Sequence, residues 1–154
     1  MNIDEYYMQI ALKEANKALK CNEVPVGAVI VCDNKIIAKG HNLREIKKDI
    51  TKHAELITIK KASRKIKDWR LNNMVMYVTL FPCPMCASAI VQSRISKVVI
   101  GASSNDLRNT EIVNQIFKDE RNKFLIEIKD KVLENECSLI LKQFFQLQRK
   151  LGKK

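Results

Sequence analysis

The stretch YVTLFPCPMCASAIVQSRI, residues 77–95, contains the change of secondary structure that decides the fold. Together with the residues before it, residues 74–81 (MVMYVTLF) form an apolar and β-branched run that predicts a strand. Proline is tolerated in the first turn of a helix, so residues 84–95 predict a helix that begins at Pro84. A strand followed at once by a helix is the building unit of an α/β fold. The turn between the two holds a pair of cysteines, Cys83 and Cys86.

The rest of the chain alternates between helical and extended patterns in the same way. Apolar residues at helical spacing predict further helices over residues 4–20, 52–67 and 111–120, and a long one from Leu133 onward. Apolar runs predict further strands over Ala28–Cys32, Ile36–Ala38, 97–102 and 124–129. The first two strands are expected to form a hairpin, and the later ones, joined by helices, to be parallel. We therefore predict one domain over residues 1–154, a three-layer α/β/α sandwich with a five-stranded mixed sheet.

Composition and charge narrow the class of protein. The 154 residues carry 28 basic and 17 acidic side chains, a formal net charge of +11, which favours an anionic partner such as nucleic acid over a generally lysine-rich surface. No apolar run approaches the roughly 18 residues that a membrane span needs, so no membrane partner is expected. The N-terminus carries early acids, so it is not expected to be a signal peptide. Five cysteines without a secretion signal favour the reducing cytoplasm over a disulfide framework.

A possible metal site is formed by His53, Glu55 and the two cysteines. His53 opens a predicted helix, Glu55 follows two residues later, and Cys83 and Cys86 lie 30 and 33 residues after His53. Residues three apart on a helix face the same side, and the positive end of a helix favours the thiolate form that binds metal. Two sulfurs and one nitrogen suit Zn²⁺. The rival interpretation of the Cys-x-x-Cys pair is a redox motif, which would leave His53 and Glu55 unexplained.

The number of ligands separates a structural from a catalytic zinc site. A structural site is closed by four protein ligands, whereas a catalytic site keeps one position for water. Three good ligands are present, and the other candidates are more typical of packed or idle residues, namely Cys21, Cys32, Cys137 and His41. We therefore favour a catalytic site in which Glu55 moves protons without binding the metal.

At these residues the sequence resembles the zinc-dependent cytidine/adenosine deaminase superfamily, whose signature is H-x-E followed by P-C-x-x-C. Within it, the chain is similar to the bacterial tRNA-specific adenosine deaminases. The matching segments follow one another over most of the chain, and they include EVPVGAVIV, GHN, TKHAEL, YVTLFPCPMCASAIVQSRI and ECSLILKQFFQLQRK. The resemblance implies conversion of adenosine to inosine at the wobble position of a tRNA anticodon, usually that of an arginine tRNA.

The resemblance also implies roles for particular residues. One zinc per subunit is implied on His53, Cys83 and Cys86, with Glu55 transferring protons while water replaces the amino group at C6 of adenine. Further substrate contacts are implied for Asn42 at the flipped nucleotide, for Val26 in the wall of the base pocket, for the backbone N–H of Ala54, and for Phe145 and Arg149 toward the RNA. A homodimer bound to a tRNA anticodon stem-loop is implied, and DNA is not an expected partner.

Two departures from the family pattern lie close to these residues. Phe81 stands where the family usually has glutamate before the proline of P-C-x-x-C. The segment Ser103–Ile112 replaces a glycine-containing loop that helps to frame the substrate, and it has no glycine itself. An alternative function is therefore deamination of a small molecule such as guanine, cytosine or a nucleoside, although a neutral base needs no charge of +11. A third hypothesis is an inactive zinc-bearing RNA-binding module, against which the intact set of His53, Glu55, Cys83 and Cys86 argues.

Overall fold

The computed structural model describes residues 1–122 and 124–152. One sheet has the strand order β2-β1-β3-β4-β5. Its strands are β1 (Gly27–Cys32), β2 (Lys35–His41), β3 (Val75–Leu80), β4 (Lys97–Ala102) and β5 (Glu127–Lys129). The helices are α1 (Ile3–Lys20), α2 (Arg44–Lys47), α3 (Ala54–Ile66), α4 (Pro84–Gln92), α5 (Leu107–Phe117) and α6 (Glu134–Lys150). No helix among these residues is long and apolar enough to cross a membrane.

The directions of the strands bring several loops to one edge of the sheet. β1 is antiparallel to both of its neighbours, β2 and β3, whereas β3, β4 and β5 are parallel. The predicted hairpin and the predicted parallel strands are confirmed. The carboxyl ends of β2, β3 and β4 therefore meet the amino end of β1 at one edge. Such an edge is where α/β sheets place their ligands.

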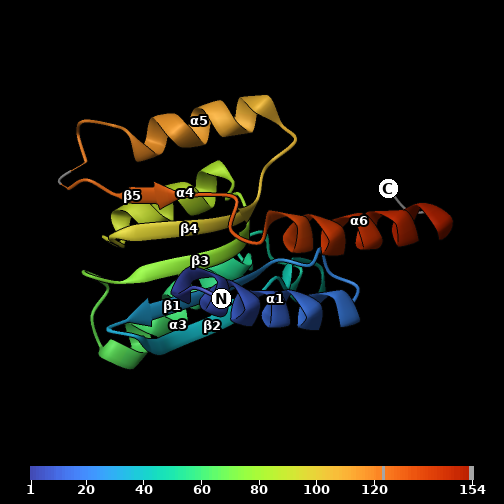
Figure 1. Ribbon diagram of the computed structural model, residues 1–154, viewed down its shortest axis with the longest axis horizontal. Coiled ribbons are helices and arrows are strands. Elements are labelled where there is room, and N and C mark those ends of the chain that lie inside the picture. Colours follow the sequence, from blue (N-terminus) through green and yellow to red (C-terminus); the bar gives the residue numbers. More distant parts are fainter. Residues whose placement is uncertain (123, 153–154) are drawn as a thin grey trace.

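Helices cover both faces of the sheet. α1 and α6 lie on one face, and α3, α4 and α5 lie on the other (Figure 1). α1 sits directly on the backbone of β1, since a Cβ at Gly27 would lie 2.1 Å from the carbonyl oxygen of Ala11. Apolar side chains fill both interfaces, with Ile30, Ile90 and Ile100 on one side of the sheet. The predicted three-layer α/β/α sandwich with a five-stranded mixed sheet is confirmed.

The structure corrects the prediction around α5. The segment Ser103–Ile112 was expected to be a loop and the helix to begin at residue 111, but α5 begins at Leu107. The reason is a helix cap, because the carboxylate of Asp106 accepts hydrogen bonds from the backbone N–H groups of Arg108 (3.0 Å) and Asn109 (3.2 Å). The short helix α2 was not predicted, and β5 is shorter than the predicted strand 124–129.

Candidate active site

A cavity of about 220 Å³ opens at the edge of the sheet where these strand ends meet. Each part of the chain that reaches this edge contributes to its lining: the entry to β1, the exits of β2, β3 and β4, and the first turns of α3 and α5. The lining residues are Val24, Val26, Asn42, Arg44, His53, Ala54, Glu55, Leu80, Phe81, Cys83, Ser104 and Asn109. The strand directions thus collect residues that are up to 85 positions apart in the sequence (109 − 24).

The starts of α3 and α4 place the three predicted ligands together. His53 and Cys83 are the residues immediately before the two helices, in extended conformation, and Cys86 lies in the first turn of α4. Pro84 occupies the first helical position, which fixes where the helix begins and hence the directions of the two thiols. The Nδ1 atom of His53 lies 3.7 Å from Sγ of Cys83 and 3.5 Å from Sγ of Cys86.

These distances fit a zinc ion. With zinc–nitrogen bonds of about 2.0–2.1 Å and zinc–sulfur bonds of about 2.3 Å at tetrahedral angles, a nitrogen and a sulfur ligand lie about 3.6 Å apart. Among the described residues, His53, Cys83 and Cys86 are the group whose ligand atoms come within 4.8 Å of one another. The donor set and its spacing therefore suit Zn²⁺ held by three protein ligands.

The electrostatics of the two thiols prepare them for a cation. A hydrogen bond from Cys86, together with one from His53, lowers the pKa of Cys83 to about 4. The same hydrogen bond to Cys83, with burial, raises the pKa of the Cys86 thiol well above its usual range. The pKa of His53 is raised mainly by its hydrogen bond to Cys83. The thiolate form of Cys83, which is the form that binds a metal ion, is therefore favoured at this site.

Glu55 is the buried carboxyl of the cavity. It lies in the first turn of α3, and its side chain is almost fully removed from solvent, with 4% of the residue exposed. Burial, with a smaller contribution from the nearby Cys83, raises its pKa to about 7. A carboxyl of this kind can both accept and deliver a proton near neutral pH.

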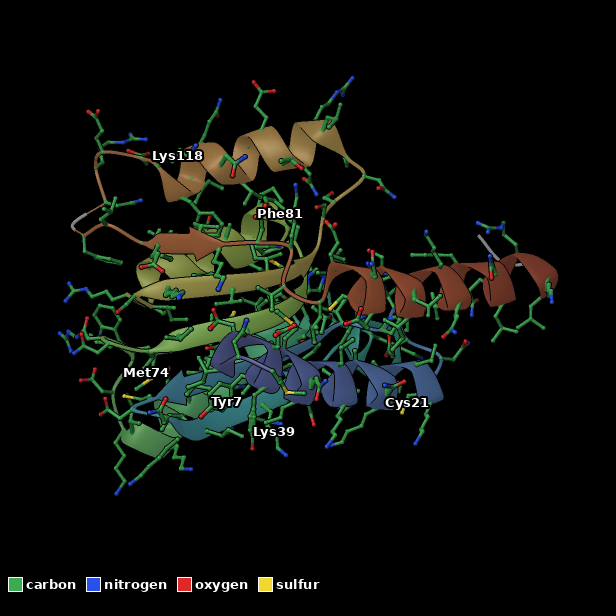
Figure 2. The ribbon with its side chains drawn as sticks, in the orientation of Figure 1. Tyr7, Cys21, Lys39, Met74, Phe81 and Lys118 are labelled. Carbon is green, nitrogen blue, oxygen red and sulfur yellow. The ribbon has the colours of Figure 1, made fainter. Side chains whose placement is uncertain are left out.

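The four residues considered as alternative ligands lie outside the cluster. Cys21 is exposed at the end of α1 (Figure 2), and Cys32 is partly buried beside Asp33. Cys137 is buried where α6 packs on β4. His41 faces Glu14, with 3.4 Å between Nδ1 and the carboxylate.

The residues predicted to contact the substrate fall into two groups. Val26, Asn42 and Ala54 line the cavity. Phe145 and Arg149 do not; they line an adjoining groove of about 730 Å³ between α6 and the segment that leads from β4 into α5. The groove and the cavity share Val24, Leu80 and Ser104 in their linings, so they adjoin each other.

The side chain of Asn42, which lines the cavity, is held in place by two hydrogen bonds to the backbone. Its Nδ2 donates to the carbonyl oxygen of Val24 (3.2 Å), and its Oδ1 accepts from the backbone N–H of Arg44 (3.1 Å). One N–H of the amide is left over for a ligand, since the side chain has two such donors. The structure thus makes Asn42 a part of the wall with a single remaining donor.

Glu23 supports this wall and was not singled out from the sequence. It is fully buried, and its carboxylate accepts hydrogen bonds from the backbone N–H groups of Glu45 (3.0 Å) and Ile46 (2.8 Å). The two bonds hold α2 and thereby Arg44, which faces the cavity. No local signal could have revealed this, because the partners lie 22 and 23 residues away.

Comparison with known proteins identifies the family. The model of the cytidine and deoxycytidylate deaminase zinc-binding region matches residues 1–102, which hold all three candidate ligands and Glu55. The chain belongs to this family. It is similar to the tRNA-specific adenosine deaminase of Bacillus subtilis, with 44% identity over 153 residues that cover 99% of this chain and 95% of that protein.

Solved structures of the family agree with this result. A structure from studies of A-to-I editing by tRNA:A34 deaminases superimposes with a TM-score of 0.81 at 34% identity, covering 88% of this chain and 98% of the other. Guanine deaminase from Bacillus subtilis superimposes with a TM-score of 0.65 at 31% identity, covering 82% and 84% of the two chains. The family therefore includes members that act on a tRNA and members that act on a free base.

Proposed function

We propose that this deaminase converts adenosine to inosine at the wobble position of a tRNA anticodon, and that an arginine tRNA is its substrate. The observation that supports this most directly is that a cavity and a groove lie side by side at one edge of the sheet. A cavity of about 220 Å³ holds a zinc-type donor set beside the buried Glu55. A groove of about 730 Å³ adjoins it and is lined by Phe145 and Arg149. The cavity suits one base, and the groove suits the chain that carries it.

In the proposed reaction, His53, Cys83 and Cys86 hold one Zn²⁺ per subunit. When bound, zinc acts as a Lewis acid that lowers the pKa of a water molecule toward 7. Glu55 takes a proton from the attacking water and delivers protons to N1 of the adenine ring and to the departing amine. Overall, the C6–N6 bond breaks, a C6–O bond forms, and inosine and ammonia are the products. In this proposal the backbone N–H of Ala54 orients the attacking water, which is supported by the absence of a side-chain cap at the start of α3.

The walls of the cavity suit a flat base carried on a nucleic acid. Val26, Leu80 and Phe81 offer apolar contact to its faces, and Arg44 offers a cation at the mouth. Phe145 is 43% exposed in the groove, where an aromatic ring can stack on a neighbouring base. Lys142 and Arg149 supply positive charge along the same groove. A net charge of +11 agrees with a polyanionic substrate and favours no uncharged one.

We further propose that residues 1–154 act as one domain in a cytoplasmic homodimer. The apolar side chains of Ile46 and Ile50 support a partner subunit next to the cavity, because they are 51% and 71% exposed on the segment that flanks it. The five free cysteines suit a reducing compartment. Sedimentation of the purified protein would test the dimer, and a monomer at micromolar concentration would contradict it.

Deamination of free guanine is the second candidate, favoured by the structural likeness to guanine deaminase. One experiment separates the two. The zinc-loaded protein is incubated with an arginine tRNA anticodon stem-loop and, in parallel, with guanine, cytosine and free adenosine. Inosine in the RNA, read by nuclease digestion and chromatography, is the expected result. Turnover of a free base without inosine in the RNA would overturn the proposal.

A further inference from the structure

The inner face of α5 ends in a polar residue at the cavity. Asn109, Val113 and Phe117 recur every four residues and so share one side of the helix. Val113 and Phe117 are buried in the apolar core beneath α5. Asn109 continues the same side but lines the cavity instead. If this position only packed against the core, an apolar residue would be sufficient. The amide of Asn109 therefore indicates a polar partner.

No hydrogen bond between described residues engages the side-chain amide of Asn109. Its backbone N–H donates to the carboxylate of Asp106 (3.2 Å). Asn109 therefore presents both a donor and an acceptor to the cavity. Asn42 across the cavity differs, since two of its polar atoms are already bonded to the protein.

The position of Asn109 is fixed by the hydrogen bonds that start α5. The backbone N–H of Asp106 donates to Oγ of Ser104 (3.1 Å), and the Ser103 hydroxyl donates to the carboxylate of Glu134 at the start of α6 (3.1 Å). The turn before α5 is thus bonded both within itself and to the neighbouring helix. A side chain carried on such a turn is held in place for a ligand.

The surroundings of Asn109 indicate what kind of group it meets. Phe81 lines the same cavity and follows directly after the carboxyl end of β3 (Figure 2). The two departures from the family pattern, Phe81 and the segment Ser103–Ile112, therefore both contribute to the lining of this cavity. Phe81 supplies an apolar surface and Asn109 an uncharged polar group, which together suit the face and the edge of a nucleoside.

We infer that Asn109 is a specificity-determining residue whose amide hydrogen-bonds the nucleoside in the cavity, at N3 or N7 of the purine or at the ribose 2′-hydroxyl. The inference rests on the proposed function, because it assumes that an adenosine enters the cavity. Both kinds of atom pair with an amide, and neither is consumed in the reaction at C6.

A double-mutant cycle between protein and substrate tests the inference. Asn109→Ala is compared with the wild type on four stem-loops that carry adenosine, 7-deazaadenosine, 3-deazaadenosine or 2′-deoxyadenosine at the wobble position. Asn109→Ala is expected to lower kcat/KM on adenosine by about fivefold to tenfold. For one of the three altered nucleosides, the variant and the wild type are expected to react at equal rates, because the bond is already missing.

The matched control is Asn114→Ala, an asparagine on the same helix that lines neither the cavity nor the groove. It should leave kcat/KM unchanged on all four substrates, and both variants should keep their zinc and their melting temperature. An equal loss for Asn109→Ala on all four substrates, or no loss at all, would overturn the inference while leaving the proposed function intact. A wild-type protein that makes no inosine in any stem-loop would instead overturn both.

Discussion

Two parts of the cavity are formed by the first turns of helices: the zinc corner (His53, Cys83 and Cys86) and the α5 corner (Asp106 and Asn109). They differ in whether a side chain caps the helix. At the zinc corner, the capping positions of α3 and α4 are taken by His53 and Cys83, whose side chains make no capping hydrogen bond. At the α5 corner, Asp106 caps the helix in the usual way. A capping side chain stabilises a protein by about 1 kcal/mol. The zinc corner thus lacks the stabilisation of a capping hydrogen bond, because its capping residues are candidate metal ligands. At the α5 corner, the capping hydrogen bond stabilises the helix that lines the cavity.

The largest expected effect comes from removing a ligand at the zinc corner. Cys86→Ala should lose both bound zinc and deaminase activity, because two remaining ligands hold the metal too weakly. Zinc content by elemental analysis and inosine formation would be measured together. Cys137→Ala is the matched control, since it also removes a buried thiol but lies on α6 outside the cluster. A Cys86→Ala protein that keeps stoichiometric zinc would show that the site has other ligands.

Glu55→Gln should leave the zinc in place and still lower kcat by about 10²- to 10⁴-fold, the usual value of positioned proton transfer. The amide keeps the size of the carboxyl but cannot carry the proton. Asp4→Asn is the control, because Asp4 is another buried carboxyl, on α1, that binds Lys129 and Tyr77. It should affect stability but not kcat. An unchanged kcat for Glu55→Gln would assign the proton transfers to another group.

Changes at the walls should have smaller effects than changes at the zinc corner. Glu23→Gln places an amide donor against one of the two partly buried N–H groups of Glu45 and Ile46, which costs about 1 kcal/mol of unfolding free energy. Because α2 then shifts with Arg44, KM for the stem-loop should rise several-fold while the zinc content stays constant. Urea unfolding and steady-state kinetics measure the two effects. Glu111→Gln, an exposed acid on α5, is the control. A loss of stability with unchanged KM would limit Glu23 to a role in folding.

The smallest effect is expected from the cap of α5. Asp106→Ala should cost about 1 kcal/mol of stability and should lower kcat/KM by only about twofold to fivefold, as the first turn of α5 loosens beside the cavity. Asn2→Ala removes the cap of α1, far from the site, and should cost similar stability with no change in rate. Equal rates for the two variants would show that the α5 corner tolerates fraying and would weaken the comparison between the corners.

The two corners also differ in how far the sequence predicted them. At the zinc corner, the start of α4 and the shared side of Cys83 and Cys86 depend on a short spacing and on Pro84, which are local properties and so were predictable. The approach of His53, which lies 30 residues before Cys83, was expected only from the joint pattern of H-x-E and P-C-x-x-C. The α5 corner was read as a loop because residues 103–110 have no apolar periodicity. The capping signal was present in Asp106, three residues before Asn109. The place of Phe145 and Arg149 in a groove rather than the cavity depends on how α6 packs, and no local pattern contains that information.

The contact between α6 and β4 contains a thiol whose alkylation can report how often α6 separates from the sheet. A Cβ at Gly101 would lie 2.4 Å from Sγ of Cys137, so the thiol is pressed directly against the strand. Burial raises the pKa of Cys137 to about 12, and an alkylating reagent can therefore attack this thiol only after α6 has lifted away. Cys21, exposed at the end of α1, reacts without any opening and sets the reference rate. The delay between the two modifications, followed by mass spectrometry, would time how often the helix that carries Phe145 and Arg149 leaves the sheet.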